Sequence, residues 1–100
     1  MKDINIEEMQ KMINNENIII IDVRLEEEYI RKHTNNAISI QLYELEDKIK
    51  RMKISKDTDI LVYCKSGMKS KNASRILDDM GYINVYNLKG GFGQGKYINT

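Results

Sequence analysis

The sequence predicts an α/β fold in which helices cover both faces of a small, mostly parallel sheet. Short runs of β-branched and other apolar residues alternate along the chain with segments whose apolar residues recur at helical spacing. This alternation is typical of parallel strands joined by right-handed crossovers. The chain has 100 residues, of which 41% are hydrophobic, enough for one core but not for two. We therefore expect a single domain spanning residues 1–100.

The first two elements are a helix and a buried strand. Asn5 precedes the helix, which we expect over residues 6–13, and Glu8 follows three positions later, as in a capping box with an asparagine cap. The strand is expected over residues 18–23, where consecutive isoleucines precede an aspartate and a valine. A continuous β-branched run is typical of a strand that is covered on both faces. It therefore predicts a central parallel strand.

The middle of the chain carries shorter elements. We expect a short helix over residues 26–31, a turn over 34–36 and a second, shorter strand over 37–40. A surface helix follows from Leu42 to Met52, because apolar residues recur there every three or four positions. Its other side carries acid-before-base pairs four residues apart, which stabilise helices. They are Glu44/Lys48, Glu46/Lys50 and Asp47/Arg51.

The second half of the chain predicts a strand, a helix and a last strand. After a polar turn, a buried strand is expected over residues 59–64, with Cys64 at its C-terminal end. The helix that follows stops at Gly81, a residue type that suits the position after a helix. The last strand is expected near residues 83–88. Ligands bind beyond the carboxyl ends of parallel strands, and both Cys64 and Arg24 follow such ends.

Composition excludes several classes of partner and site. Lysine and arginine total 16 against 15 acidic residues, so we expect no nucleic-acid partner and no attraction to a membrane surface. No apolar run approaches the roughly 18 residues of a membrane span, and the polar N-terminal segment does not resemble a signal peptide, which favours a cytoplasmic location. A single cysteine excludes an intrachain disulfide, and a single histidine excludes a Cys/His zinc cluster, so we expect no metal.

The segment of residues 64–70, the Cys64 loop, favours an anionic sulfur. It lies between a strand end and a helix start, where backbone N–H groups converge and the helix dipole favours negative charge. Gly67 allows the left-handed backbone that lets the loop curl around its centre. Neighbouring lysines add positive charge, and each of these effects lowers the pKa of a thiol. The lysines are Lys65, Lys69 and Lys71. We therefore expect a thiolate at neutral pH, in a loop that can hold a small oxyanion.

Several candidate residues also have a purely structural interpretation. Cys64 could be an inert core thiol, because free cysteine is among the most buried residue types. Asp22 and Arg24 lie at the same sheet edge as the Cys64 loop, and we interpret them as structural. Arg24 is expected to pair with Glu28 or a neighbouring acid, and Asp22 to accept backbone hydrogen bonds. His33 is interpreted as a turn residue rather than a catalytic base.

Five segments of the chain match known sequence motifs in a fixed order. Residues 62–70 are similar to an active-site loop with the pattern Y-C-R-S-G-x-R-S. The other four are Ile20-Ile21-Asp22-Val23-Arg24, similar to a D-V-R strand end; Glu28-Tyr29, similar to an acidic–aromatic pair; Ala37-Ile38-Ser39-Ile40, similar to A-I-N-I; and Val85-Tyr86-Asn87-Leu88-Lys89-Gly90-Gly91, similar to V-x-x-L-x-G-G. Together they extend over nearly the whole chain, which resembles the rhodanese-like family in its single-domain form.

This resemblance implies a five-stranded parallel sheet and an activity of the thiosulfate sulfurtransferase type. Cys64 would be the catalytic nucleophile, taking sulfane sulfur from a small anionic donor such as thiosulfate, or from a small persulfide, and holding it as a persulfide. The acceptor would be cyanide in an assay, and a thiol or a protein in cells. The loop would bind the donor, and its backbone amides would hold the terminal sulfur. The substrate-binding residues would be Lys65, Ser66, Gly67, Met68, Lys69 and Ser70. No organic cofactor is implied.

Three departures from the family pattern bear on function. Lys69 stands where the family usually has an arginine, and a lysine lacks the planar fork that grips an oxyanion. Asn36 replaces a usual glycine, and asparagine tolerates the left-handed conformation that a turn needs there. The chain has no tryptophan, whereas the family has one near Gly95. Phe92 or Tyr97 is expected to fill that space.

Two other functions remain as alternatives to the sulfurtransferase hypothesis. A catalytically weak binding or redox-sensing module with the same fold is favoured by Lys69 and by the missing tryptophan. Phosphatase or arsenate reductase chemistry is less favoured, because the loops of those enzymes carry one more residue before an arginine.

Overall fold

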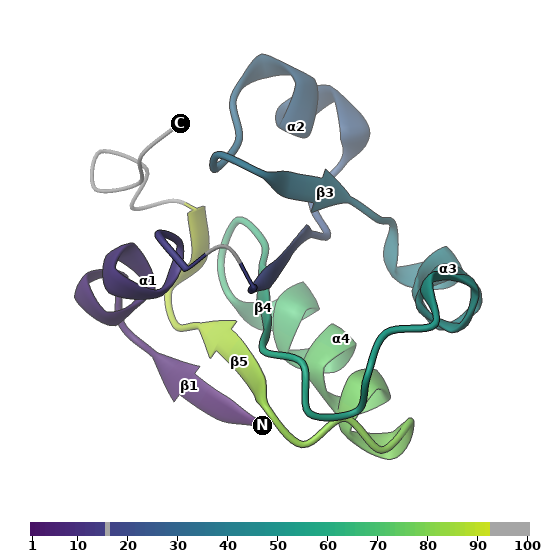
Figure 1. Ribbon diagram of the computed structural model, residues 1–100. Helices are drawn as coiled ribbons and strands as arrows, with labels where there is room; N and C mark the ends of the chain where they lie inside the picture. Colours follow the sequence, from purple (N-terminus) through teal and green to yellow (C-terminus); the bar gives the residue numbers. More distant parts are fainter. Residues whose placement is uncertain (16, 93–100) are drawn as a thin grey trace.

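The computed structural model describes residues 1–15 and 17–92 and contains a five-stranded sheet in the order β1-β5-β4-β2-β3 (Figure 1). All four pairs of neighbouring strands are parallel, which confirms the expected α/β class. The strands are β1 (Lys2–Ile4), β2 (Ile19–Asp22), β3 (Ala37–Ser39), β4 (Ile60–Tyr63) and β5 (Val85–Leu88). Because β4 is the central strand, Cys64 lies at the middle of the carboxyl edge of the sheet.

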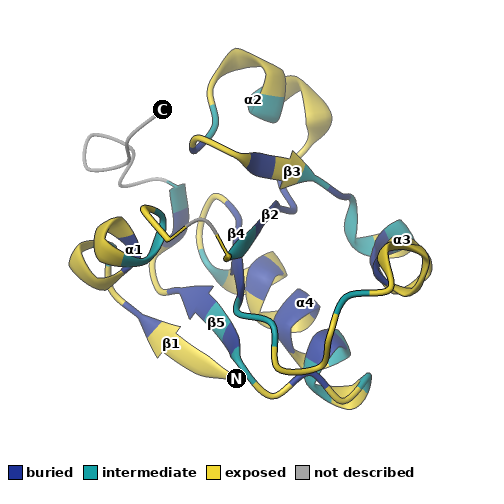
Figure 2. Ribbon diagram, viewed as in Figure 1, coloured by how far each residue is buried: buried dark blue, intermediate teal, exposed yellow. Residues whose placement is uncertain are grey.

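Helices pack on both faces of the sheet. They are α1 (Ile6–Met12), α2 (Glu26–Arg31), α3 (Leu45–Met52) and α4 (Met68–Asp79), with a 3-10 turn at Leu42–Glu44 before α3. One core cluster joins Val62 of β4 to residues of α3 and α4, and a second joins Leu61 and Tyr63 to residues of α1 and α2. Consecutive β4 side chains therefore point to opposite faces, and every residue of the strand is buried (Figure 2).

Contacts within the helices confirm several local predictions. The capping box of α1 is present, with Glu8 N donating to Asn5 Oδ1 at 2.8 Å and Asn5 N to Glu8 Oε1 at 3.1 Å. All three expected ion pairs around α3 form, with N–O distances of 3.1 to 3.2 Å. Asn36 and Gly81 both have positive φ, as a left-handed turn and a helix end require.

Two elements differ from the expectation. The sequence does not predict β1, because Lys2 and Asp3 are polar and exposed and only Ile4 is buried. This strand is held by its parallel pairing with β5. The helix expected from Leu42 begins as a 3-10 turn, and α3 starts at Leu45.

Candidate active site around Cys64

Cys64 lies directly after β4 and is almost completely buried, with 2% of its surface exposed. The next residues turn sharply, and Gly67 adopts φ +93° immediately before α4. A Cβ at Gly67 would lie 3.2 Å from the backbone nitrogen of Gly90, so a side chain there would be both strained and crowded. The strand end, the glycine and the helix start thus place the Cys64 sulfur beneath the N-terminus of α4.

Hydrogen-bond donors of the Cys64 loop point at this sulfur. The backbone N–H of Gly67 donates to Cys64 Sγ at 3.0 Å, and that of Ser70 donates at 3.3 Å. The Ser70 hydroxyl oxygen lies 3.3 Å from the same atom. The two N–H groups match the expected convergence of backbone amides on a single point, and they favour a negatively charged sulfur.

These contacts determine the ionisation of Cys64. Burial alone would raise the pKa of the thiol, but hydrogen bonds with Ser70 and with the backbone N–H groups of Gly67 and Ser66 outweigh it, and the pKa lies below the ordinary value. The sequence predicts this direction. It attributes part of the effect to lysines, however, whereas the main causes of the lowering are these hydrogen bonds. The loop lysines have exposed side chains in contact with water, which screens their charge.

The residues expected to bind substrate occupy two environments. Lys65, Ser66, Met68 and Lys69 are exposed, and Met68 is 74% exposed. Ser70 is fully buried, and its hydroxyl contacts Cys64 Sγ and Asn87 Oδ1. The exposed residues can meet a small anion from solvent, whereas the Ser70 side chain acts on the sulfur from within the core.

Asp22 and Arg24 form a buried ion pair at the same edge of the sheet. Arg24 Nη2 lies 2.8 Å from Asp22 Oδ2, and the Arg24 backbone N–H donates to Asp22 Oδ1 at 2.9 Å. The guanidinium also donates to the carbonyl of Lys32 at 2.5 Å and covers the ring of Phe92, 3.9 Å from its centroid. The acid that pairs with Arg24 is therefore Asp22. Both side chains connect neighbouring segments of the chain through these contacts.

Phe92, which follows β5, contacts both β4 and the Cys64 loop. Its ring stacks on Tyr63, with centroids 5.3 Å apart, and its backbone N–H donates to the Cys64 carbonyl at 2.6 Å. Phe92 thus supplies an aromatic ring beside the Cys64 loop, while Tyr97 and Gly95 lie outside the described residues. Gly91 makes this approach possible: its φ is +68°, and a Cβ there would lie 2.5 Å from the carbonyl oxygens of Cys64 and Lys65.

Sequence reasoning misses two polar residues connected to this site. Asn87 is 3% exposed, and its side-chain Nδ2 donates to Asp3 Oδ1 at 3.0 Å. A polar residue inside an otherwise apolar strand is a signal that could have singled out Asn87. Nothing in the sequence could have singled out Asp3, because the strand that carries it has no apolar pattern.

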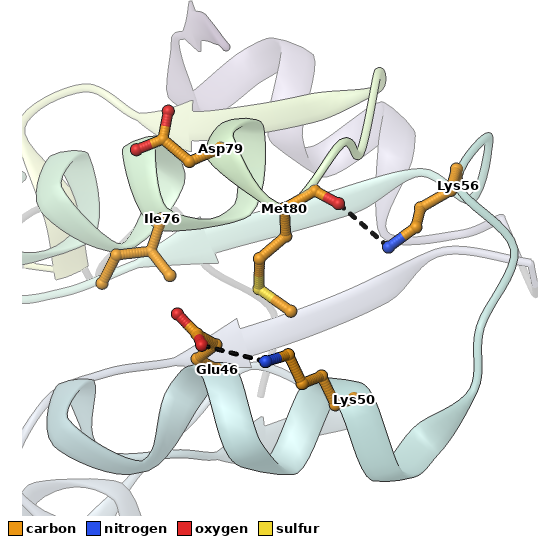
Figure 3. A pocket seen from close by; sticks show the side chains of 6 residues that line it. All are labelled: Glu46, Lys50, Lys56, Ile76, Asp79 and Met80. Carbon is orange, nitrogen blue, oxygen red and sulfur yellow. Dashed lines mark hydrogen bonds and ion pairs between the residues drawn. The ribbon is translucent and has the colours of Figure 1, made fainter.

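The remaining candidates lie apart from the sulfur. His33 Nδ1 lies 2.7 Å from the carbonyl oxygen of Tyr29, and the two rings stack, which fits a turn residue. A surface cavity of about 330 Å³ lies between α3 and the C-terminal end of α4 (Figure 3). Three of its charged groups have partners: Lys50 pairs with Glu46, and Lys56 donates to the Met80 carbonyl. Met80 lines this cavity, and Ser70 contacts the Cys64 sulfur at the other end of α4. The two residues are ten positions apart, which is roughly 15 Å along the helix axis, so the cavity is separate from the site around Cys64.

Two kinds of feature are absent from residues 1–15 and 17–92. No group of three or more His, Cys, Asp or Glu side chains in this part of the chain could hold a metal ion. No helix in it has the length and apolar character needed to cross a membrane.

Comparison with known proteins identifies relatives along most of the chain. The family model described as "Rhodanese-like domain" matches residues 5–96. The thiosulfate sulfurtransferase PspE of Escherichia coli (strain K12) is 40% identical over 70 residues, covering 70% of this chain and 67% of that protein. The thiosulfate sulfurtransferase GlpE of Coxiella burnetii is 32% identical over 91 residues, covering 91% and 83%. A rhodanese-like domain protein from Staphylococcus aureus has a similar crystal structure, with a TM-score of 0.79, 26% identity and coverage of 93% and 89%.

Proposed function

The chain belongs to the rhodanese-like domain family and is a sulfurtransferase of that kind, and we propose that Cys64 carries the transferred sulfur as a persulfide. The observation that supports Cys64 most directly is the pair of backbone N–H groups, from Gly67 and Ser70, that donate to its sulfur at 3.0 and 3.3 Å. They stabilise the thiolate that must attack, and they can stabilise the anionic persulfide that results. The names of the relatives do not favour the alternative of a catalytically weak binding module.

The proposed reaction has two displacement steps at sulfur. The Cys64 thiolate attacks the outer sulfur of thiosulfate; the new S–S bond forms as the bond inside thiosulfate breaks, and sulfite leaves with the electron pair. An acceptor then attacks the terminal sulfur of the persulfide and regenerates the thiolate. With cyanide as acceptor the product is thiocyanate, and charge balances in both steps without an external oxidant.

We assign the Cys64 loop to substrate binding in this scheme. The backbone amides from Lys65 to Lys69 would hold the terminal sulfur, since this segment already curls around the thiol. Ser66 and Met68 would border the entering donor, and Gly67 would supply the turn. Small anions such as thiosulfate fit this open, lysine-bearing surface, and the natural acceptor would be a thiol or a protein that requires sulfur.

Uptake of sulfur from thiosulfate tests the proposed function directly. Incubation with thiosulfate is expected to add the mass of one sulfur atom to the intact chain, and cyanide is expected to remove it with release of thiocyanate. Because the chain has one cysteine, no other thiol can account for the gain. If neither thiosulfate nor a small persulfide adds sulfur to the native protein, the proposed function is wrong.

The lowered pKa of Cys64 predicts a pH dependence of its reactivity. Alkylation by iodoacetamide should accelerate as pH rises through the pKa of the thiol and then level off. Its midpoint should lie below that of the same cysteine in the unfolded chain, because the native pKa is lowered. The chain unfolded in denaturant is the control, because it lacks the hydrogen bonds to sulfur. A native midpoint at or above that of the unfolded chain would contradict the proposed stabilisation of the thiolate.

The lowered pKa of Cys64 also affects the stability of the fold. The thiolate stabilises the fold at high pH, and this contribution is lost as pH falls through the native pKa.

Lys69 is expected to contribute to binding of the donor through its charge. Lys69→Arg should lower the KM for thiosulfate and Lys69→Gln should raise it, each by about two- to fivefold, because the side chain is exposed and its ion pairs are weak. Steady-state kinetics at low and high salt measure both effects. Lys50→Gln, on α3, is the matched control for loss of a charge. Equal changes in KM for Lys69→Gln and Lys50→Gln would show that the backbone amides, rather than Lys69, determine donor binding.

A further inference from the structure

A chain of hydrogen bonds connects the Cys64 sulfur to the edge strand β1. The Ser70 hydroxyl lies 3.3 Å from Cys64 Sγ and 2.5 Å from Asn87 Oδ1, and Asn87 Nδ2 lies 3.0 Å from Asp3 Oδ1. Cys64, Ser70 and Asn87 are buried, whereas Asp3 is exposed. The parallel register of β1 and β5 places Asp3 directly opposite Asn87, so the backbone itself brings the last two members together.

The direction of each hydrogen bond follows from the chemistry of the groups. An ionised carboxylate can only accept, so the amide of Asn87 must turn its Nδ2 toward Asp3. Its Oδ1 then faces Ser70, and because an amide oxygen also can only accept, the Ser70 hydroxyl must donate its hydrogen to Asn87. The hydroxyl oxygen is left to face the Cys64 sulfur with its lone pairs.

This orientation suits a neutral thiol and opposes a thiolate. The contribution of the Ser70 side chain to the lowered pKa of Cys64 needs the opposite orientation, in which the hydroxyl donates to the sulfur. A neutral thiol can donate its proton to the Ser70 oxygen, and the 3.3 Å contact between the two atoms has this direction, with sulfur as the donor. A thiolate has no proton to donate and needs a donor instead. The hydroxyl can supply that hydrogen bond only by turning away from Asn87, which would leave the buried Oδ1 without its partner at a cost in free energy.

We propose that Asp3 and Asn87 are positioning residues, which fix the direction in which the Ser70 hydroxyl points beside the Cys64 sulfur. The edge strand β1 thereby restrains the ionisation of a thiol at the centre of the sheet. Only the consequence for sulfur transfer rests on the proposed function, since the orientation of the hydroxyl exists without any donor or acceptor.

Other charged groups surround the site and must be held constant in a test. They are Lys65 and Lys69 on the Cys64 loop and Lys71 on α4, Asp22 and Arg24 at the end of β2, Lys2 on β1, and Lys89 after β5. Substitution of Asp3 leaves all of them in place. It does remove one negative charge, which by itself would favour a thiolate, so the test must separate that direct effect from the effect transmitted through Ser70.

The test is a titration of the Cys64 thiolate in Asp3→Asn. Ultraviolet absorbance follows the thiolate, and the titration curve of Cys64→Ser is subtracted to remove the ionisation of the tyrosines. With a neutral partner the Asn87 amide can turn over and donate to Ser70, which frees the hydroxyl to donate to sulfur. The midpoint should then fall by about one pH unit, the size expected for one hydrogen bond gained by an anion. Glu27→Gln, which removes an exposed charge on α2, should leave the midpoint unchanged.

Two further measurements separate the effect transmitted through Ser70 from the direct effect of the lost charge. One repeats the titration in a Ser70→Ala background, and the other repeats it at a second salt concentration. In Ser70→Ala the same Asp3→Asn substitution should shift the midpoint by no more than a few tenths of a pH unit. In about 1 M salt, where charges are screened beyond about 3 Å, the shift in the Ser70 protein should persist. The comparison at high salt remains decisive even if Ser70→Ala does not fold, because it uses only proteins that carry Ser70. No shift, an equal shift in both backgrounds, or a shift abolished by salt would overturn the proposal. None of these measurements uses a sulfur donor, so failure of the proposed function would leave them interpretable.

Discussion

Replacement of Cys64 by serine is expected to reduce the conversion of thiosulfate and cyanide to thiocyanate by at least about a thousandfold. Serine keeps the size and the hydrogen-bonding capacity of the side chain, but its oxygen is not ionised at neutral pH and cannot form a disulfide-type bond with sulfane sulfur. The chain contains no second cysteine that could substitute for it. Release of thiocyanate and the intact mass after incubation with thiosulfate measure the loss.

The fold of this variant is the necessary control. The backbone N–H groups that donate to Cys64 Sγ can donate equally to a serine oxygen, so a cooperative thermal transition and an unchanged circular dichroism spectrum are expected. Cys64→Ala, which lacks any nucleophile, should be as inactive as Cys64→Ser. Substantial thiocyanate production by either folded variant would place the sulfur carrier elsewhere.

Much of the fold follows from local patterns in the sequence. The isoleucine run of β2 and the apolar run of β4 are recognisable because both faces of these strands are covered, which favours apolar residues at consecutive positions. The capping box of α1 and the ion pairs of α3 are interactions between residues three or four apart, so they too are visible in sequence. β1 is not, because it depends on pairing with β5, more than 80 residues away, and two of its three side chains face solvent.

The same distinction applies to the candidate site. Cys64 and the loop after it form one continuous segment, so their chemistry can be predicted from the sequence. The chain of hydrogen bonds to Asn87 and Asp3 joins three separate segments, and residues 84 positions apart meet in it. The lowering of the pKa of Cys64 also depends on geometry: hydrogen bonds with Ser70 and backbone amides act at contact distance, whereas the lysines are exposed and water screens their charge. Proximity in sequence therefore overstates their influence.

Gly91→Ala is expected to lower the free energy of unfolding by about 3 kcal/mol or more, from left-handed strain and overpacking together. Gly91 has φ +68°, and its added Cβ would lie 2.5 Å from two backbone oxygens, those of Cys64 and Lys65. Neither oxygen belongs to a side chain that could move aside, so the Cys64 loop or the turn after β5 must shift. That shift would also break the hydrogen bond from Phe92 N–H to the Cys64 carbonyl. Denaturant unfolding measures the loss of stability.

Gly81→Ala separates the steric clash from the strain of the backbone. Gly81 has an equally left-handed φ of +97°, but the nearest atoms to an added Cβ are methylene carbons of Lys56 at 3.9 and 4.0 Å. That variant should lose only the left-handed penalty of about 1–2 kcal/mol and keep full sulfur transfer. Gly91→Ala should in addition take up sulfur more slowly in the fraction that stays folded, because the displaced backbone carries the donors to Cys64. Equal losses of stability in the two variants, with sulfur uptake unchanged in both, would show that the close approach of Gly91 does not hold the Cys64 loop in place.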